Sequence, residues 1–226
     1  IPKPKKVLYL LAEGGFYPNR DRIQTMSENI SITKQENFDI VFSPRININN
    51  DEGFESIIKQ INDSEAEVLI IDPFVRFHDA DENSASAMSE VLGAFRELIE
   101  KLGISIILVH HTGKIESKGG RGSSAIIGEY DSCITICKSG DTDLRLKYDM
   151  RHVETPPSNL IRFNSKTFWF ENQSGIVEII ESAGGCLPKD DLIKLYDNPK
   201  STTYRHIKKV IKSGSIIEED GILTTV

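Results

Sequence analysis

The sequence contains few cysteines and no long apolar run, and both absences limit what the protein can be. Its only cysteines, Cys133, Cys137 and Cys186, include no C-x-x-C pair. We therefore expect neither a disulfide framework nor a zinc site, and a reducing, cytoplasmic compartment fits best. No stretch approaches the roughly 20 apolar residues that span a bilayer, and the start of the chain does not resemble a leader, so we expect no membrane association.

An excess of positive charge is also missing. The 226 residues include 27 Lys and Arg against 34 Asp and Glu, which gives a formal net charge of −7. This balance argues against general polyanion binding, because such binding is driven by excess Lys and Arg, so any nucleic acid must be held by local basic patches. With 38% hydrophobic residues, the chain can bury one large domain, or a medium domain and a small one.

The N-terminal part alternates apolar strands with helices. Short apolar runs end abruptly at polar or turn residues, as buried parallel strands do. These runs are Val7–Ala12, Phe38–Ser43, Val68–Asp72 and Ile104–His111. Helices are expected at 19–28, around Ile57 to Ile61, and at 84–102, where apolar residues recur at helical spacing and Gly103 follows. Such strand-helix-strand units cross over to pair side by side, which predicts an α/β fold with a mostly parallel sheet.

The pattern changes toward the C-terminus. Alternating runs at 134–138, 144–150, 159–163 and 167–170 predict a hairpin-rich edge. Helical patterns then follow at 176–182, 189–196 and 201–212, with a hairpin at the end. We therefore expect a RecA-like core over 1–172 and a small winged helix-turn-helix domain over 173–226, with the third helix in the recognition position.

Three predicted strands end in side chains that can do chemistry. Glu13, Asp72 and His111 follow separate strands, and the carboxyl ends of parallel strands meet at one edge of a sheet. Asp72 could orient the water shell of Mg²⁺ beside nucleotide phosphates, and Glu13, followed by two glycines, could polarise an attacking water. Asp72 could equally end a strand before a proline turn, and Glu13 could be a loop carboxylate. His110 should point away from His111 and pack or cap.

The acidic segment His78–Asn83 invites a metal-site interpretation. A loop that leads into a helix capped by Asn83 and Ser84 explains the same residues without an ion. We favour the loop.

Four stretches, taken together in order and spacing, resemble the RecA-fold core of the RepA-type hexameric replicative helicases of plasmids and phages, relatives of the DnaB group. They are Val7-Leu-Tyr-Leu-Leu-Ala-Glu13, Val68–Asn83, Ile107–Lys114 and Arg121–Ala125. The resemblance covers most of residues 7–170. It implies ATP and Mg²⁺ as cofactors, a homo-oligomeric ring and single-stranded DNA as a partner.

The resemblance also assigns roles to individual residues. Glu13 matches the catalytic glutamate, Asp72 the Walker B aspartate that holds Mg²⁺ through water, and His111 the sensor of the γ-phosphate. Arg151 matches the arginine finger that acts on the neighbouring subunit's nucleotide. An ion pair at the surface is the alternative for Arg151.

A loop rich in Gly, Lys and Ser matches the channel-facing DNA loop of the family. Its expected DNA contacts are Lys114, Lys118 and Arg121. Arg121 could instead cap a turn.

The sequence departs from the family in having no G-x-x-x-x-G-K-[ST] segment. In the family this phosphate-binding loop lies just upstream of the strand that matches Val7–Ala12, where this chain starts. We therefore expect a fragment that, as it stands, binds ATP poorly or not at all, because the β- and γ-phosphates lose most of their ligands.

The predicted third helix of the C-terminal domain carries the strongest local basic patch in the chain. Arg205, Lys208 and Lys209 could contact a DNA groove or phosphates. Winged helices also dock proteins, and the acidic segment Glu218–Asp220 would repel phosphate, so a replication partner protein is the alternative.

These observations together predict the ATP-dependent motor of a plasmid, phage or mobile-element DNA helicase. Two other functions remain open. One is an ATPase of the same fold that regulates recombination without unwinding DNA, and the other is a degenerate scaffold that only binds DNA or protein.

Overall fold

The structure is a computed structural model that describes residues 3–29, 36–111, 124–139, 143–156, 158–173, 175–196, 200–212 and 214–226. The chain divides into two compact units, Ile1–Asp131 and Ser132–Val226. The predicted α/β class, with a parallel sheet flanked by helices, is confirmed in the first unit. The domain boundary expected near residue 172 falls inside the second unit and stays a prediction.

The first unit is built on a four-stranded parallel sheet. Its strands are β1 (Val7–Leu11), β2 (Phe38–Phe42), β3 (Val68–Asp72) and β4 (Ser105–Leu108), in the order β2-β1-β3-β4. Leu11 is in register with both Phe42 and Asp72, and Ile71 with Leu108. The four predicted strands are therefore confirmed, and their carboxyl ends share one edge.

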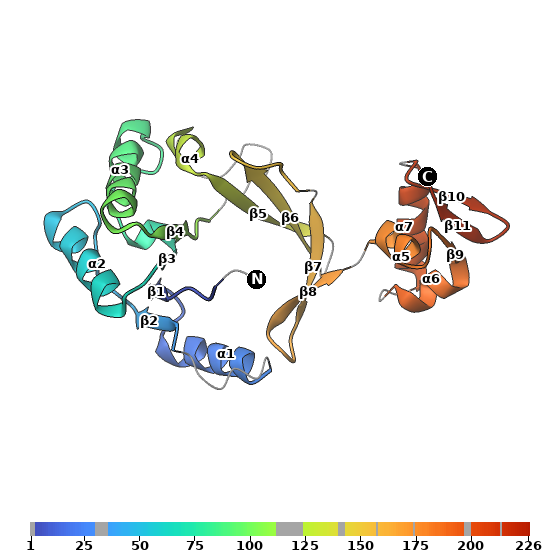
Figure 1. Ribbon diagram of the computed structural model, residues 1–226, viewed down its shortest axis with the longest axis horizontal. Helices are drawn as coiled ribbons and strands as arrows, with labels where there is room; N and C mark the ends of the chain where they lie inside the picture. The colour runs from blue at the N-terminus through green and yellow to red at the C-terminus, as the bar shows by residue number, and fades with distance from the viewer. Residues whose placement is uncertain are drawn as a thin grey trace. The chain divides into compact units, whose positions relative to one another are not determined.

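The helices of this unit lie on both faces of the sheet. They are α1 (Phe16–Asn29), α2 (Asp51–Ser64), α3 (Ala85–Leu102) and α4 (Ser124–Glu129), with a short 3₁₀ helix, η1 (Phe74–Arg76). Figure 1 shows α2 and α3 together beside the sheet and α1 at the β2 edge. Leu8 and Leu10 point toward α2 and α3 and are buried, whereas Tyr9 points to the opposite face, where its ring contacts Phe38.

Helix α3 begins and ends where the sequence predicts. The Ser84 side chain accepts a hydrogen bond from the Ala87 N–H at 3.3 Å, and Gly103 ends the helix with φ 64°. Satisfying the free N–H groups of the first turn stabilises a helix by about 1 kcal/mol. The apolar face of α3, with Met88, Val91 and Phe95, is buried in the core of the unit.

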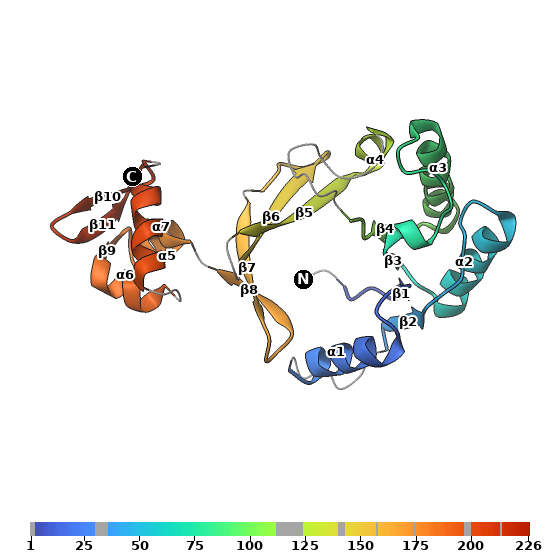
Figure 2. The same cartoon turned by 180° about the vertical axis from the view of Figure 1, so that it is seen from behind.

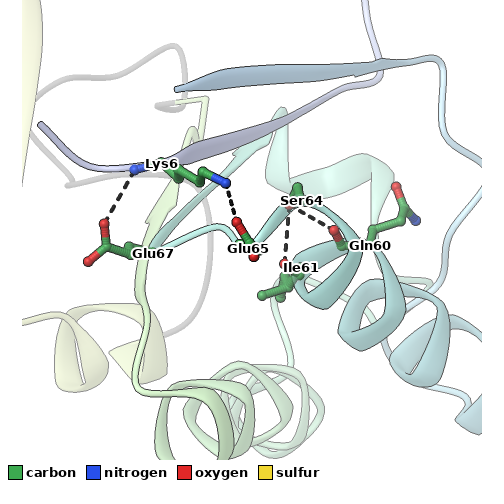
Figure 3. Close-up of polar contacts among 6 residues, drawn as sticks. All are labelled: Lys6, Gln60, Ile61, Ser64, Glu65 and Glu67. Atoms are coloured by element: carbon green, nitrogen blue, oxygen red, sulfur yellow. Dashed lines mark hydrogen bonds and ion pairs between the residues drawn. The ribbon is translucent and has the colours of Figure 1, made fainter. Parts of the chain in front are cut away.

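The turn between α2 and β3 is fastened to the start of β1. Figure 3 shows the Lys6 backbone N–H donating to Glu67 at 3.4 Å, while the Lys6 ammonium pairs with Glu65. The Ser64 hydroxyl donates to the carbonyls of Gln60 and Ile61, at 2.8 and 3.2 Å. These contacts lie at the end of the sheet opposite to the strand ends that carry Glu13 and Asp72.

The second unit contains a four-stranded antiparallel sheet. Its strands β5 (Ser132–Ser139), β6 (Asp143–Met150), β7 (Asn159–Asn164) and β8 (Trp169–Gln173) pair in sequence order. The hairpin-rich prediction for this region is confirmed. Arg162 and Asp143, which face each other on β7 and β6, form an ion pair at 2.8 Å.

The end of the chain forms a helical group with its own small sheet, seen in Figure 2. Its elements are α5 (Ile176–Ser182), β9 (Cys186–Pro188), α6 (Lys189–Leu195), α7 (Lys200–Lys212), β10 (Ile216–Glu219) and β11 (Ile222–Thr225). The strands pair antiparallel in the order β10-β11-β9, around a core that includes Ile180, Leu192 and Ile207. The three helices and the hairpin agree with prediction, but β9 was not predicted. No helix in the described part of the chain is long and apolar enough to cross a membrane.

Candidate active site

Backbone hydrogen bonds join three strand ends into one edge. The Ala12 N–H donates to the Asp72 carbonyl at 2.7 Å, which ties the end of β1 to the end of β3. The Val109 N–H donates to the Ile71 carbonyl at 2.9 Å, and the Phe74 N–H donates to the Val109 carbonyl at 2.8 Å. The segments that carry Glu13, Asp72 and His111 are therefore held side by side by main-chain contacts.

The Glu13 carboxylate lies between two side chains from the neighbouring segments. His111 Nε2 is 3.9 Å from Glu13 Oε2, and Arg76 Nε is 3.6 Å from Glu13 Oε1. The Glu13 side chain remains 45% exposed, so water can reach it. A carboxylate that is both held in place and open to water is suited to act as a general base.

Asp72 is held by a residue from the adjacent strand. The Tyr9 hydroxyl on β1 donates a hydrogen bond to Asp72 Oδ2. Burial, together with this hydrogen bond, raises the pKa of Tyr9 above its usual value, so the phenol keeps its proton at neutral pH and remains a donor. Tyr9 thus fixes one oxygen of the Asp72 carboxylate.

The backbone next to Glu13 is held by a buried amide. Asn19, only 4% exposed, donates from Nδ2 to the carbonyls of Glu13 and Gly15, both at 2.8 Å. Gly14 has φ +82°, and a Cβ at this position would lie 2.7 Å from Asn19 Nδ2. The turn after β1 therefore requires a glycine, for conformation and for space.

The two adjacent histidines differ in exposure, as predicted. The His111 side chain is 67% exposed and lies by Glu13, whereas that of His110 is 18% exposed. His110 packs edge-on against Phe74 and has its Nδ1 3.8 Å from Glu82 Oε1. His110 is thus a packing residue, and His111 belongs to the site.

The described residues suit magnesium only as a ligand that arrives with other oxygen donors. Among them, no group of three or more His, Cys, Asp or Glu side chains could hold a metal ion, and this includes the acidic segment His78–Asn83. Mg²⁺ is usually bound through one or two carboxylates, with water and substrate phosphates as its other ligands. Asp72, half-buried at the sheet edge with one oxygen fixed by Tyr9, fits that role.

The other predicted site residues lie elsewhere in the chain. Arg151 follows β6 in the second unit and is exposed, and Arg205, Lys208 and Lys209 lie exposed on α7. Lys114, Lys118 and Arg121 lie outside the described residues.

Three residues of the site were missed by the sequence prediction. These are Tyr9, Asn19 and Arg76. The only signal in the sequence for Tyr9 is a hydroxyl within an otherwise apolar strand, and for Arg76 a cation four residues after Asp72.

Comparison with known proteins agrees with this geometry. The solved ATPase domain of a DnaB-like helicase matches with a TM-score of 0.58 and 12% sequence identity, and the match covers 74% of this chain and 74% of that one. At this identity the likeness establishes a shared RecA-like fold. No curated protein matches the sequence. The AAA domain family matches residues 1–117, which contain β1 to β4 and the whole of the edge that carries Glu13, Asp72 and His111. The chain therefore belongs to the AAA domain family.

Proposed function

We propose that the chain is the ATP-hydrolysing core of a DnaB-like replicative helicase of the RepA type, which acts in the cytoplasm on plasmid, phage or mobile-element DNA. The observation that carries this proposal is the position of Glu13 between His111 and Arg76, beside the strand that ends in Asp72. The fold shared with the ATPase domain of the DnaB-like helicase supports it.

In this function Glu13 takes a proton from the water that attacks the terminal phosphate. His111 and Arg76, on opposite sides of the carboxylate, keep it oriented. Asp72 would hold Mg²⁺ through water, and the ion supplies positive charge to the phosphate oxygens. Tyr9 keeps the Asp72 carboxylate in a single orientation.

The proposal includes assembly into a ring. Arg151 would act on the nucleotide of the neighbouring subunit, as an arginine finger does. Single-stranded DNA would be held by Lys114, Lys118 and Arg121, which follow His111 in the sequence. A γ-phosphate sensor placed directly before a DNA-binding loop couples nucleotide state to DNA contact.

The test is hydrolysis by the full-length protein with Glu13 replaced. Glu13→Gln should leave ATP binding nearly unchanged and lower hydrolysis by about 100-fold or more, because the general base is lost. Glu100→Gln, which alters an exposed carboxylate on α3, serves as the matched control and should retain activity. Wild-type turnover by Glu13→Gln would remove Glu13 from the mechanism.

Strand displacement separates the helicase from the two other functions. A helicase releases a labelled strand from a forked duplex in an ATP-dependent manner. A regulator of recombination hydrolyses ATP without releasing the strand, and a scaffold neither binds nor hydrolyses ATP. Either of the last two results overturns the proposal.

A further inference from the structure

Helix α7 presents a cationic face in an acidic protein. Between Lys200 and Lys212 the helix contains no Asp or Glu, although the whole chain has a net charge of −7. All of its Lys and Arg side chains are exposed: Lys200, Arg205, Lys208, Lys209 and Lys212. Such a local concentration of positive charge is suited to a polyanion.

The opposite side of α7 holds the helix rigidly against its neighbours. Thr203 and Ile207 are fully or almost fully buried, at 0% and 1% exposed. His206 Nδ1 and the Tyr196 hydroxyl at the end of α6 are 2.9 Å apart and share a hydrogen bond. The cationic face is thus presented by a fixed element, which lowers the conformational entropy lost on binding.

The acidic hairpin beside α7 is partly neutralised. The carboxylate of Glu218 on β10 accepts a hydrogen bond from Lys189 Nζ at 2.6 Å, and the same ammonium lies 5.4 Å from the centre of the Tyr204 ring on α7. Glu219 and Asp220 remain exposed at the β10-β11 turn. A polyanion is therefore expected to contact the helix and to avoid the tip of the hairpin.

The order of elements gives the shape of the ligand. The sequence α5, β9, α6, α7, β10, β11, with β10-β11-β9 as a small antiparallel sheet, is that of a winged helix-turn-helix, in which the third helix enters the major groove. We propose that α7 binds double-stranded DNA, with its helix in the major groove and its lysines and arginine on the flanking phosphates. This activity goes beyond the proposed motor, which engages single-stranded DNA through residues after His111 and depends on nucleotide.

The test is binding of the intact chain to a fluorescent duplex, followed by anisotropy without ATP over a series of salt concentrations. Lys208→Ala/Lys209→Ala should weaken binding at low salt by about 10-fold or more and reduce the slope of log K against log salt by about 2, because each phosphate contact contributes about one. Lys208→Arg/Lys209→Arg should keep near wild-type affinity, because the charge and the reach are preserved.

A matched control removes the same charge elsewhere in the second unit. Lys147→Ala/Lys166→Ala alters two exposed lysines on β6 and in the β7-β8 turn and should bind the duplex as the wild type does. The proposal is overturned if the α7 variant and this control lose affinity equally, or if the wild type prefers a single strand to the duplex. It is also overturned if the wild type binds no duplex, the result expected of a helix that docks an acidic protein. ATP hydrolysis enters none of these readouts, so the result is independent of the proposed motor function.

Discussion

Arg76 Nε lies 3.6 Å from Glu13 Oε1, so a cation from the turn after β3 contacts the carboxylate at the end of β1. The contact spans two strand ends that are already joined by the Ala12 to Asp72 hydrogen bond. Arg76 is thus a positioning residue for Glu13. Its distance from Glu13 depends on η1, whose first residue is bonded to Val109.

Replacing Arg76 should lower the rate of hydrolysis more than it weakens nucleotide binding. In the full-length protein, Arg76→Met should reduce kcat by about 10- to 100-fold with little change in KM, because the general base loses its orientation. Arg76→Lys should restore part of the rate, and Arg45→Met, at another exposed arginine of the first unit, should have no effect. A rise in KM at constant kcat would mean that Arg76 binds substrate and does not position Glu13.

Removing the Tyr9 hydroxyl should weaken the use of magnesium. Tyr9→Phe keeps the ring contact with Phe38 and deletes the hydrogen bond to Asp72. Residues that orient a metal-binding group contribute about 10- to 100-fold to metal affinity, so the Mg²⁺ concentration for half-maximal hydrolysis should rise by at least 10-fold. Tyr17→Phe on α1, at a 68% exposed tyrosine, is the control. An unchanged Mg²⁺ requirement would show that Tyr9 only packs.

Arg151 should act across a subunit boundary. Arg151→Ala and Glu13→Gln should each abolish most hydrolysis alone, and a mixture of the two should regain activity. In randomly mixed rings about a quarter of the interfaces join an intact Glu13 to an intact Arg151. Hydrolysis by the mixture is compared with the sum of the separate variants. If the mixture gives only that sum, the site is not shared between subunits.

The stability of the first unit should fall in mild acid because of His78. Burial lowers the pKa of His78, against the opposing effects of Glu82, the Ala80 backbone and Asp79, and His110 lowers it further. The unfolded chain, with a His pKa of about 6.5, therefore binds the proton first as the pH falls, so stability present at pH 7 is lost toward about pH 5.

His78→Phe removes this titration and keeps a ring against Phe74, which lies 4.6 Å from His78 between ring centres. Urea midpoints measured by circular dichroism between about pH 7.5 and 5 should then vary less than in the wild type. His152→Phe, at an exposed histidine of the second unit, should leave the wild-type dependence unchanged. Equal pH dependence of His78→Phe and wild type would contradict the prediction.

The parts of the fold that were predicted correctly are those where a pattern repeats. The four apolar runs of the parallel sheet and the helical spacing of α3 each involve several residues, so one substitution does not hide the signal. The three-residue strand β9 has no such repetition. It forms because Leu187 packs into the same core as Leu223 of β11, a tertiary contact that the local sequence does not indicate.

The candidate site divides in the same way. Glu13, Asp72 and His111 could be predicted because each follows an apolar run, which places it at the end of a strand. Tyr9 could not be predicted, because a tyrosine within a strand is expected on β propensity alone. Arg76 lies in a turn with no periodicity, and its partner Glu13 is distant in sequence, so only the folded backbone brings the two together.

The hydrogen bonds that join Ala12, Asp72, Phe74 and Val109 involve only main-chain atoms. The spacing between the three strand tips is consequently a property of the polypeptide itself, and chemical identity at Glu13 or His111 can be exchanged without moving their anchoring points. Variants at these positions should therefore report chemistry and leave the architecture unaltered.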